Sequence, residues 1–416
     1  MGSTRAFAHN DDNNENTLLV WAGDKAHEAP DFLAVIDFDK DSPHYGKILR
    51  TIPLPAGVLG TGAVGNEPHH AGLSSDGSTL ALGGLLSFLR GQPQVFFFDV
   101  TQPRHPRFVG SNNPSEASIT DEFVPLRNGG FLATFMGGPA GAHPGRVVEY
   151  DAHHHVVRTL PVPDDDAQYP FNPHGVSIDE AHNLMVTSDY VCPVSTLHVG
   201  GGVPHLDGSI RVWDFAKRSI IRTIPVGDMV GTMDVRLIPG DVHHRAFTAG
   251  MVDNQLYLVD TKGGTSKSVF DFSSYAVQAV PDPPIWPQLL LIDHSGTRMF
   301  ITLNFAGQAG KVVMLDISDP EYPKALSEVD LGLNSGPHYL HLTGDEKRLV
   351  VSDYFLVEDL VPGGVINSEG DMKVHVFNVF HDHFELDKNF NVDFSHDIST
   401  GPARPHALIT LPGRDD

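Results

Sequence analysis

Four histidines that follow a proline are the residues of this chain best suited to chemistry. Each stands at the start of a short apolar run that ends in a turn, in the segments Pro68-His69-His70, Pro173-His174, Pro337-His338 and Pro405-His406. Counting four residues between histidine and turn selects His70, His174, His338 and His406. Neutral imidazole nitrogen is a good ligand for iron, copper, zinc and nickel. If the four segments are equivalent repeats around one axis, the sequence predicts a site for a first-row transition metal.

Other segments aligned on the same frame contribute the remaining candidate residues. They place Glu122 at the level of the four histidines, with Asp121 as the alternative, and a carboxylate there can orient an imidazole or act as acid and base. His69 is expected to support the ligands, and Tyr190 is a further catalytic candidate. The expected pocket walls are Thr232, Gln288, Phe171, Trp286 and Tyr354.

Two alternatives to the metal site remain open. The Pro-His turn could have been copied by duplication and be structural, with each imidazole bonded to a backbone carbonyl. The ring could also be a metal-free catalytic or binding site. The adjacent pair His243-His244 and the run His153-His154-His155 are interpreted as solvated turns.

A strand that ends in an acid or its amide recurs seven times and predicts the scaffold. The copies occupy residues 33–39, 95–101, 147–153, 210–216, 256–262, 312–318 and 374–380, at intervals of 46 to 63 residues. This period fits a blade of four strands with its loops, and hairpin patterns precede most copies. The acidic residues that close these strands are interpreted as turn caps. The sequence therefore predicts an all-β, seven-bladed β-propeller.

The two ends of the chain are expected to complete one blade. The strand at residues 17–23 and the strand at residues 406–412 each lack a full local blade, so their pairing would close the ring and remove its exposed edges. Residues 17–416 are predicted to form a single propeller domain, and residues 1–16 a disordered lead.

Composition limits the classes of partner. The formal net charge of −24 repels phosphate backbones, which argues against nucleic acid. No apolar run approaches the roughly 18 residues that span a bilayer, so no membrane insertion is expected. A single cysteine rules out an intramolecular disulfide framework and favours a cytoplasmic protein. A small-molecule substrate is the expected partner, and the sequence does not indicate an oligomeric state.

Longer stretches resemble the selenium-binding protein and methanethiol oxidase family. The similar segments are residues 29–55, the EPHHAG stretch at 67–72, residues 315–326 and residues 389–413, in the family's order. The resemblance implies a seven-bladed propeller whose bacterial members oxidise methanethiol with copper held by histidines. It assigns the family's His-His pair to His69 and His70 and its C-terminal histidine to His406. The family's cysteine-rich segment after the His-His pair is absent here.

The leading functional hypothesis is a divergent member of this family, an enzyme that oxidises a small apolar substrate at iron or copper bound by His70, His174, His338 and His406. Four histidines with a nearby carboxylate are also similar, as a constellation, to the iron centre of carotenoid-cleaving propeller oxygenases. The loss of the family's cysteines motivates a second hypothesis, a cyclase or pericyclase of secondary metabolism that combines dehydration with hetero-Diels–Alder closure and uses histidine and glutamate as acid and base. A third is a non-catalytic binding scaffold.

Overall fold

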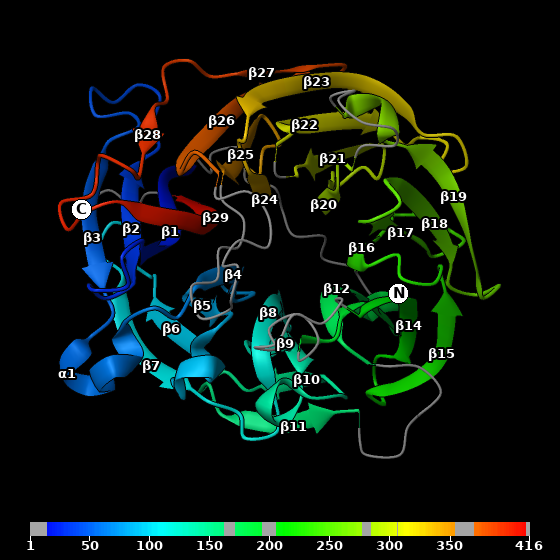
Figure 1. Cartoon of the computed structure of the whole chain (residues 1–416), viewed down its shortest axis with the longest axis horizontal. Helices are drawn as coiled ribbons and strands as arrows, with labels where there is room; N and C mark the ends of the chain where they lie inside the picture. The colour runs from blue at the N-terminus through cyan, green and yellow to red at the C-terminus, as the bar shows by residue number, and fades with distance from the viewer. Residues whose placement is uncertain are drawn as a thin grey trace, which may run out of the picture.

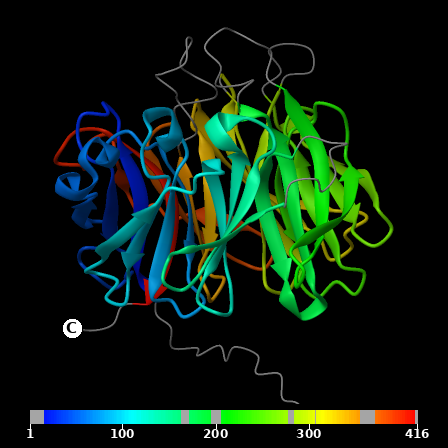
Figure 2. The same cartoon turned by 90° about the horizontal axis from the view of Figure 1, so that it is seen from below.

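Seven antiparallel sheets stand around a central axis in a computed structural model of the chain (Figure 1). The structure describes residues 15–161, 171–193, 205–276, 284–305, 307–353 and 370–412. In Figure 1 one edge strand of each sheet lies nearest the axis and the other lies at the rim. Seen from the side, the ring is one layer of blades (Figure 2). The prediction of an all-β, seven-bladed propeller is confirmed.

The strands are given blade by blade, from the axis outward. Blade one contains β29 (Ala403–Pro412), β1 (Glu15–Asp24), β2 (Phe32–Asp37) and β3 (Ile48–Pro53). Blade two contains β4 (Pro68–Leu73), β5 (Thr79–Gly84), β6 (Val95–Asp99) and β7 (Arg107–Asn112). Blade three contains β8 (Ser118–Pro125), β9 (Phe131–Gly137), β10 (Arg146–Tyr150) and β11 (Val156–Leu160). Blade four contains β12 (Pro173–Asp179), β13 (Leu184–Val191), β14 (Leu206–Asp214) and β15 (Ser219–Pro225).

The remaining three blades follow the same order. Blade five contains β16 (Thr232–Leu237), β17 (Arg245–Gly250), β18 (Gln255–Asp260) and β19 (Thr265–Asp271). Blade six contains β20 (Pro287–Ile292), β21 (Arg298–Leu303), β22 (Ala309–Asp316) and β23 (Lys324–Leu333). Blade seven contains β24 (Pro337–Leu342), β25 (Arg348–Asp353), β26 (Lys373–Val379) and β27 (Phe384–Leu386), with β28 (Val392–Asp393) also paired to β26.

Helices of the described residues are single turns between strands. They are α1 (Ala56–Leu59), η1 (Gly60–Ala63), η2 (Ser87–Arg90), η3 (Pro139–Gly141), η4 (Glu180–His182) and η5 (Ser273–Tyr275). Within the described ranges no helix has the length and apolar character needed to cross a bilayer.

Blade one closes the ring with both ends of the chain. Strand β1 pairs with β29 in antiparallel register, with Leu18 opposite Thr410 and Val20 opposite Leu408. This pairing confirms the predicted closure by terminal strands. Strand β1 begins at Glu15, two residues before the predicted start of the domain, and the rest of the predicted lead lies outside the described residues.

The seven recurring strands are the third strands of the seven blades, and their acidic ends cap turns as predicted. For example, backbone N–H groups two residues downstream donate to the carboxylates of Asp99, Asp260 and Asp316 at 2.9–3.0 Å. Such local bonds satisfy backbone donors at a turn where the ladder ends. These carboxylates therefore serve the scaffold.

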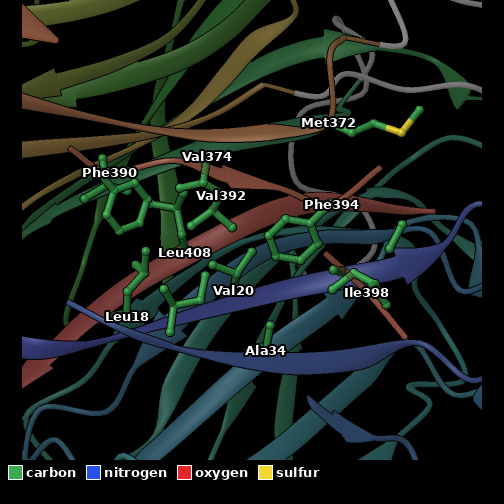
Figure 3. Close-up of a cluster of buried hydrophobic side chains, with 14 of the residues drawn as sticks. Leu18, Val20, Ala34, Met372, Val374, Phe390, Val392, Phe394, Ile398 and Leu408 are labelled. Carbon is green, nitrogen blue, oxygen red and sulfur yellow. The ribbon is translucent and has the colours of Figure 1, made fainter. Parts of the chain in front are cut away.

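Apolar side chains fill the space between neighbouring blades. Figure 3 shows one such cluster, in which Leu18, Val20 and Leu408 of blade one face Val374 and Val392 of blade seven. The alternating residues of two adjacent sheets pack here away from water, and burying each large aliphatic side chain stabilises the fold by about 1.5–3 kcal/mol. This packing joins the last blade to the closing blade.

A β-bulge near the start of every innermost strand positions the axial residues. In β4, Pro68 pairs with Gly84 and Ala71 with Leu82, so three steps on one strand match two on the other. The same shift occurs in the other six innermost strands. A bulge leaves a residue unpaired and re-aims its side chain. The two residues inside each bulge therefore form two stacked sets around the axis.

Candidate metal centre on the propeller axis

The first residue inside each bulge defines the axial ring. Its seven members are His69, Asp121, His174, Met233, Gln288, His338 and His406. The second residue inside each bulge defines the second ring, which is His70, Glu122, Gly175, Asp234, Leu289, Tyr339 and Ala407.

Predicted and observed registers differ by one residue in three blades. The sequence alignment placed His70, Glu122 and Thr232 at the level of His174, whereas the pairing places His69, Asp121 and Met233 there. The register expected from sequence counts residues back from the turn that follows each strand, and in these blades that count ends one residue after the first residue of the bulge. Had the preceding proline been used, Pro68, Pro173, Pro337 and Pro405 would have selected the correct histidines.

Five histidine side chains nevertheless lie together, because the ring of His70, from the second ring of residues, packs against His69 of the axial ring. His69 and His70 stack with ring centroids 4.2 Å apart and planes 5° from parallel. His406 lies 4.3 Å from His69, and His338 lies 4.9 Å from His406, both between centroids. One nitrogen from each of these four rings lies within 4.8 Å of the others. The structure thus brings His70, His338 and His406 together as predicted and adds His69 as an equal member.

Asp121 lies between the histidines of blades two and four. Its Oδ1 atom is 3.0 Å from Nδ1 of His70 and 3.5 Å from Nε2 of His69, and its Oδ2 atom is 3.2 Å from Nε2 of His174. His174 belongs to this carboxylate group rather than to the four-ring group. Of the two carboxylates considered from sequence, Asp121 is the one that contacts the histidines.

Burial determines the charge of this cluster. Desolvation lowers the pKa of His70 to about 3, and it lowers the pKa values of His174, His338 and His406 as well, with the neighbouring histidines adding to the effect at His70. Burial disfavours the charged form of Asp121, but the three imidazoles around it outweigh burial and hold its pKa well below its usual range. At neutral pH the rings of His70, His174, His338 and His406 are therefore neutral, and the carboxylate of Asp121 is charged.

Buried nitrogens without a hydrogen bond show whether the cluster fits a metal ion. Within the part of the chain that the structure describes, Nε2 of His70 and Nδ1 of His174 accept or donate no hydrogen bond. Buried polar atoms are almost always bonded, so such exceptions need an explanation. An all-nitrogen donor set next to one carboxylate fits a transition-metal ion. The residues present therefore fit the metal that the sequence led us to expect.

Glu122 faces away from the histidines toward an arginine of blade five. Its Oε1 atom lies 2.6 Å from Nη2 of Arg236, and its Oε2 atom accepts the N–H of Val176 at 2.9 Å. The same guanidinium lies 3.2 Å from Asp234. Burial raises the pKa of Glu122 to about 7 even though Arg236 opposes the shift. The contacts of Glu122 with Arg236 and Val176 therefore link blades three, four and five at the level of the second ring.

A cavity of about 220 Å³ opens beside the second ring. It is lined by His70, Glu122, Arg236, Leu289, Leu290, Leu291, Tyr339 and Leu340. Tyr339, which the sequence interpretation missed, lies 5.1 Å from His70 between ring centroids and donates its hydroxyl to the carbonyl of Ala71 at 3.1 Å. Its place directly after His338 was the available signal. The cavity gives a small molecule access to one histidine of the cluster.

The predicted pocket residues are dispersed. Thr232 donates its hydroxyl to the carbonyl of Asp189 at 2.5 Å, and Phe171 packs on Trp213 in a blade core, so neither lines the axial cavity. Trp286 stacks edge-on against Phe305 at 4.5 Å.

Two of the remaining candidates stay near the axis. Gln288 is buried in the axial ring, as predicted. Tyr190 lies 5.1 Å from His174 between ring centroids, and its hydroxyl donates to the sulfur of Met251 at 3.1 Å. Tyr354 lies outside the described residues.

Comparisons with known proteins agree with the fold. A family model described as 56 kDa selenium binding protein matches residues 4–416. Methanethiol oxidase of Rattus norvegicus is 24% identical, and selenium-binding protein 2 of Mus musculus is 25% identical; each alignment covers 93% of this chain and 90% of the relative. The crystal structure of a hypothetical selenium-binding protein from Sulfolobus tokodaii has a TM-score of 0.77 at 18% identity and covers 97% of this chain and 95% of its own. That structural likeness concerns the fold.

Proposed function

Because the chain belongs to the 56 kDa selenium-binding protein family, we propose that it is an enzyme that oxidises a small apolar molecule at a transition metal held by the axial histidines. The observation that carries the proposal is the buried group of four imidazoles, His69, His70, His338 and His406, whose nitrogens lie within 4.8 Å of one another. Relatives named methanethiol oxidase support the oxidoreductase class.

The metal ligands are the four imidazoles of that group, and Asp121 holds two of them, His69 and His70, in place. The close approach of Asp121 to Nδ1 of His70 favours the tautomer with its proton on Nδ1, which leaves the Nε2 lone pair for an ion. His174 packs on the other oxygen of Asp121 and fixes the carboxylate. Bound there, copper or iron would supply the redox chemistry that no side chain of the cluster provides.

The size and lining of the axial cavity support a small substrate. Drug-sized ligands need pockets of about 300–1,000 Å³, and this cavity of about 220 Å³ is smaller. Leu289, Leu290 and Leu291 supply apolar walls, so the site favours a molecule of a few heavy atoms with little polarity. Methanethiol, the substrate named for the relatives, meets both conditions and is the first compound to test.

The alternative hypotheses from sequence receive no comparable support. The relatives found carry oxidase or selenium-binding names, and none of those reported above indicates a cyclase. A buried set of five histidines also exceeds what an acid–base pair would need. We therefore propose metal-dependent oxidation alone.

Metal analysis of variants tests this function. We expect the purified protein to contain about one equivalent of copper or iron, and His338→Ala and His406→Ala to lose both the metal and the oxygen consumption that methanethiol induces. The exposed His294, which lies in the turn after β20 and pairs with Glu346, supplies the control variant His294→Ala and should keep both. A metal-free protein that consumes oxygen, or full metal content in both axial variants, would overturn the proposal.

A further inference from the structure

A second cleft lies at the other end of the innermost strands. It measures about 820 Å³ and is formed by the turns that follow the first strands of blades two to five, from Ser75 to His244. Its apolar lining includes Pro125, Ile178, Leu237 and Val242. Strand β12 runs from the axial ring to this cleft, and Asp179 stands five residues after His174, which corresponds to about 17 Å along a strand. The cleft is therefore separate from the axial cavity.

Three side chains with metal-binding atoms meet at the wall of this cleft. Nδ1 of His182 is 2.7 Å from Oδ2 of Asp179, and Nδ1 of His244 is 3.9 Å from the same oxygen. The two imidazole rings lie 4.3 Å apart between centroids, at 53° to one another. Asp179 and His182 come from blade four and His244 from blade five, so two blades converge on one point.

The spacing of these atoms suits a tetrahedral ion. Ligand atoms about 2.0–2.1 Å from zinc are separated from one another by about 3.3 Å, and the two distances to Asp179 bracket this value. His182 is the more exposed of the two histidines, so a small rotation of its ring can open the shorter distance.

Other charged groups of the cleft are already engaged. Asp241 is held by both Nε and Nη2 of Arg245, at 2.9 and 3.0 Å. Glu180 pairs with Arg127 at 3.0 Å. Among the described residues that line the cleft, the carboxylate nearest to the two imidazoles is thus that of Asp179. Its ion pairs in the described part of the chain are with His182 and His244 rather than with an arginine.

We propose that Asp179, His182 and His244 form a second metal site, which binds a divalent cation of the zinc class and is distinct from the axial centre. Two imidazoles and one carboxylate are a ligand set that zinc sites use, and three protein ligands leave a position for water or for a molecule in the cleft. Because all three residues line the cleft, that position faces an apolar hollow. The site joins adjacent blades at the face opposite the axial histidines.

The competing explanation is a local cap without metal. Asp179 accepts the N–H of His182 at 3.2 Å and so caps the short turn η4, and an Asp–His pair three residues apart occurs in many turns. This role needs neither His244 nor an ion. The two explanations differ in the number of Zn²⁺ ions that the protein retains.

Counting bound Zn²⁺ separates them. The full chain is stripped with chelator and dialysed against micromolar Zn²⁺, and its metal content is measured by mass spectrometry. We expect the double variant His182→Ala/His244→Ala to retain one equivalent fewer than the unmodified chain. The double variant His153→Ala/His155→Ala removes two exposed histidines beside Asp151 and should retain every equivalent. Equal zinc content in the His182/His244 double variant and the unmodified chain would overturn the proposal.

Two further variants guard against indirect effects. Asp179→Asn keeps an oxygen to cap η4 but removes the charge, so we expect it to lose the same equivalent while its thermal unfolding midpoint without zinc equals that of the zinc-free unmodified chain. Its retention of that equivalent would contradict the proposal even if the double variant failed to fold. His338→Ala alters only the axial centre and should keep the cleft equivalent, and loss of all zinc from this variant would show that the cleft binds none.

Discussion

Replacing Asp121 by asparagine removes the one negative charge that the axial histidines share. The substitution keeps the size of the side chain and one carbonyl oxygen. It removes the carboxylate that lies 3.0, 3.5 and 3.2 Å from nitrogens of His70, His69 and His174. The asparagine side chain also carries N–H donors, which would face imidazole N–H groups and turn at least one ring.

The expected loss follows from the role proposed for Asp121 in orienting the metal ligands. Removal of a carboxylate that orients a metal-bound histidine typically weakens metal binding by about 10- to 100-fold. In free energy this is about 1.4–2.8 kcal/mol. Because Asp121 contacts two rings of the four-histidine group and is completely buried, we expect an effect near the upper end of that range.

Competition with a chelator of known affinity measures this effect directly. The control is Asp353→Asn, which alters another completely buried aspartate that pairs with a histidine, His375, at 3.3 Å in blade seven. We expect axial copper or iron affinity to fall in Asp121→Asn and to stay unchanged in Asp353→Asn. Unchanged affinity in the first variant, or the same loss in both, would refute the assigned role of Asp121.

Three further predictions concern the scaffold. Burial lowers the folded-state pKa of His341 to about 4, and Nε2 of its neutral ring accepts the N–H of Thr410 at 3.1 Å. The neutral ring therefore stabilises the fold fully above the unfolded-state pKa of about 6.5, and this stabilisation is lost as the pH falls toward the folded-state pKa. Relative to His341→Gln, the wild type should therefore lose about 1.4 kcal/mol per pH unit between about pH 6 and pH 4 in urea titrations, and parallel pH profiles would contradict this. Arg236→Met should lower the free energy of unfolding by about 3 kcal/mol because Glu122 loses its cation, whereas a change within error would show that the pair is dispensable. Trp21→Phe should lower the free energy of unfolding by about 1–3 kcal/mol, because in the wild type the buried indole N–H donates to the carbonyl of Gly83 in blade two at 2.8 Å. An unchanged unfolding midpoint would argue against that bond.

The repeated strand pattern made the fold predictable from sequence. Each third strand ends in a carboxylate or amide, and in six blades this side chain, an aspartate, caps the following turn. This local signal recurs at intervals of 46 to 63 residues. Closure by the terminal strands followed because neither end had partners nearby. The pattern did not reveal the bulges, since the extra residue depends on pairing with a second strand and leaves no mark in one strand alone.

The composition of the axial cluster was predictable only in part. The Pro-His repeat identified His174, His338 and His406, because each proline occupies the same place before the bulge. The sequence-based register favoured His70 over His69, and Glu122 over Asp121, for the axial ring. A shift of one residue along the strand exchanges the axial ring and the second ring. The pairing of Glu122 with Arg236 joins different blades, and only the folded ring brings those two residues together.

The site of metal binding on the axis can be tested most directly by diffraction. Crystals of the protein loaded with copper or iron would be measured at the absorption edge of that metal. We expect one strong anomalous peak enclosed by the rings of His69, His70, His338 and His406, with Asp121 against the far nitrogen of His70. A map without a peak on the axis, from protein shown to contain the metal, would contradict it.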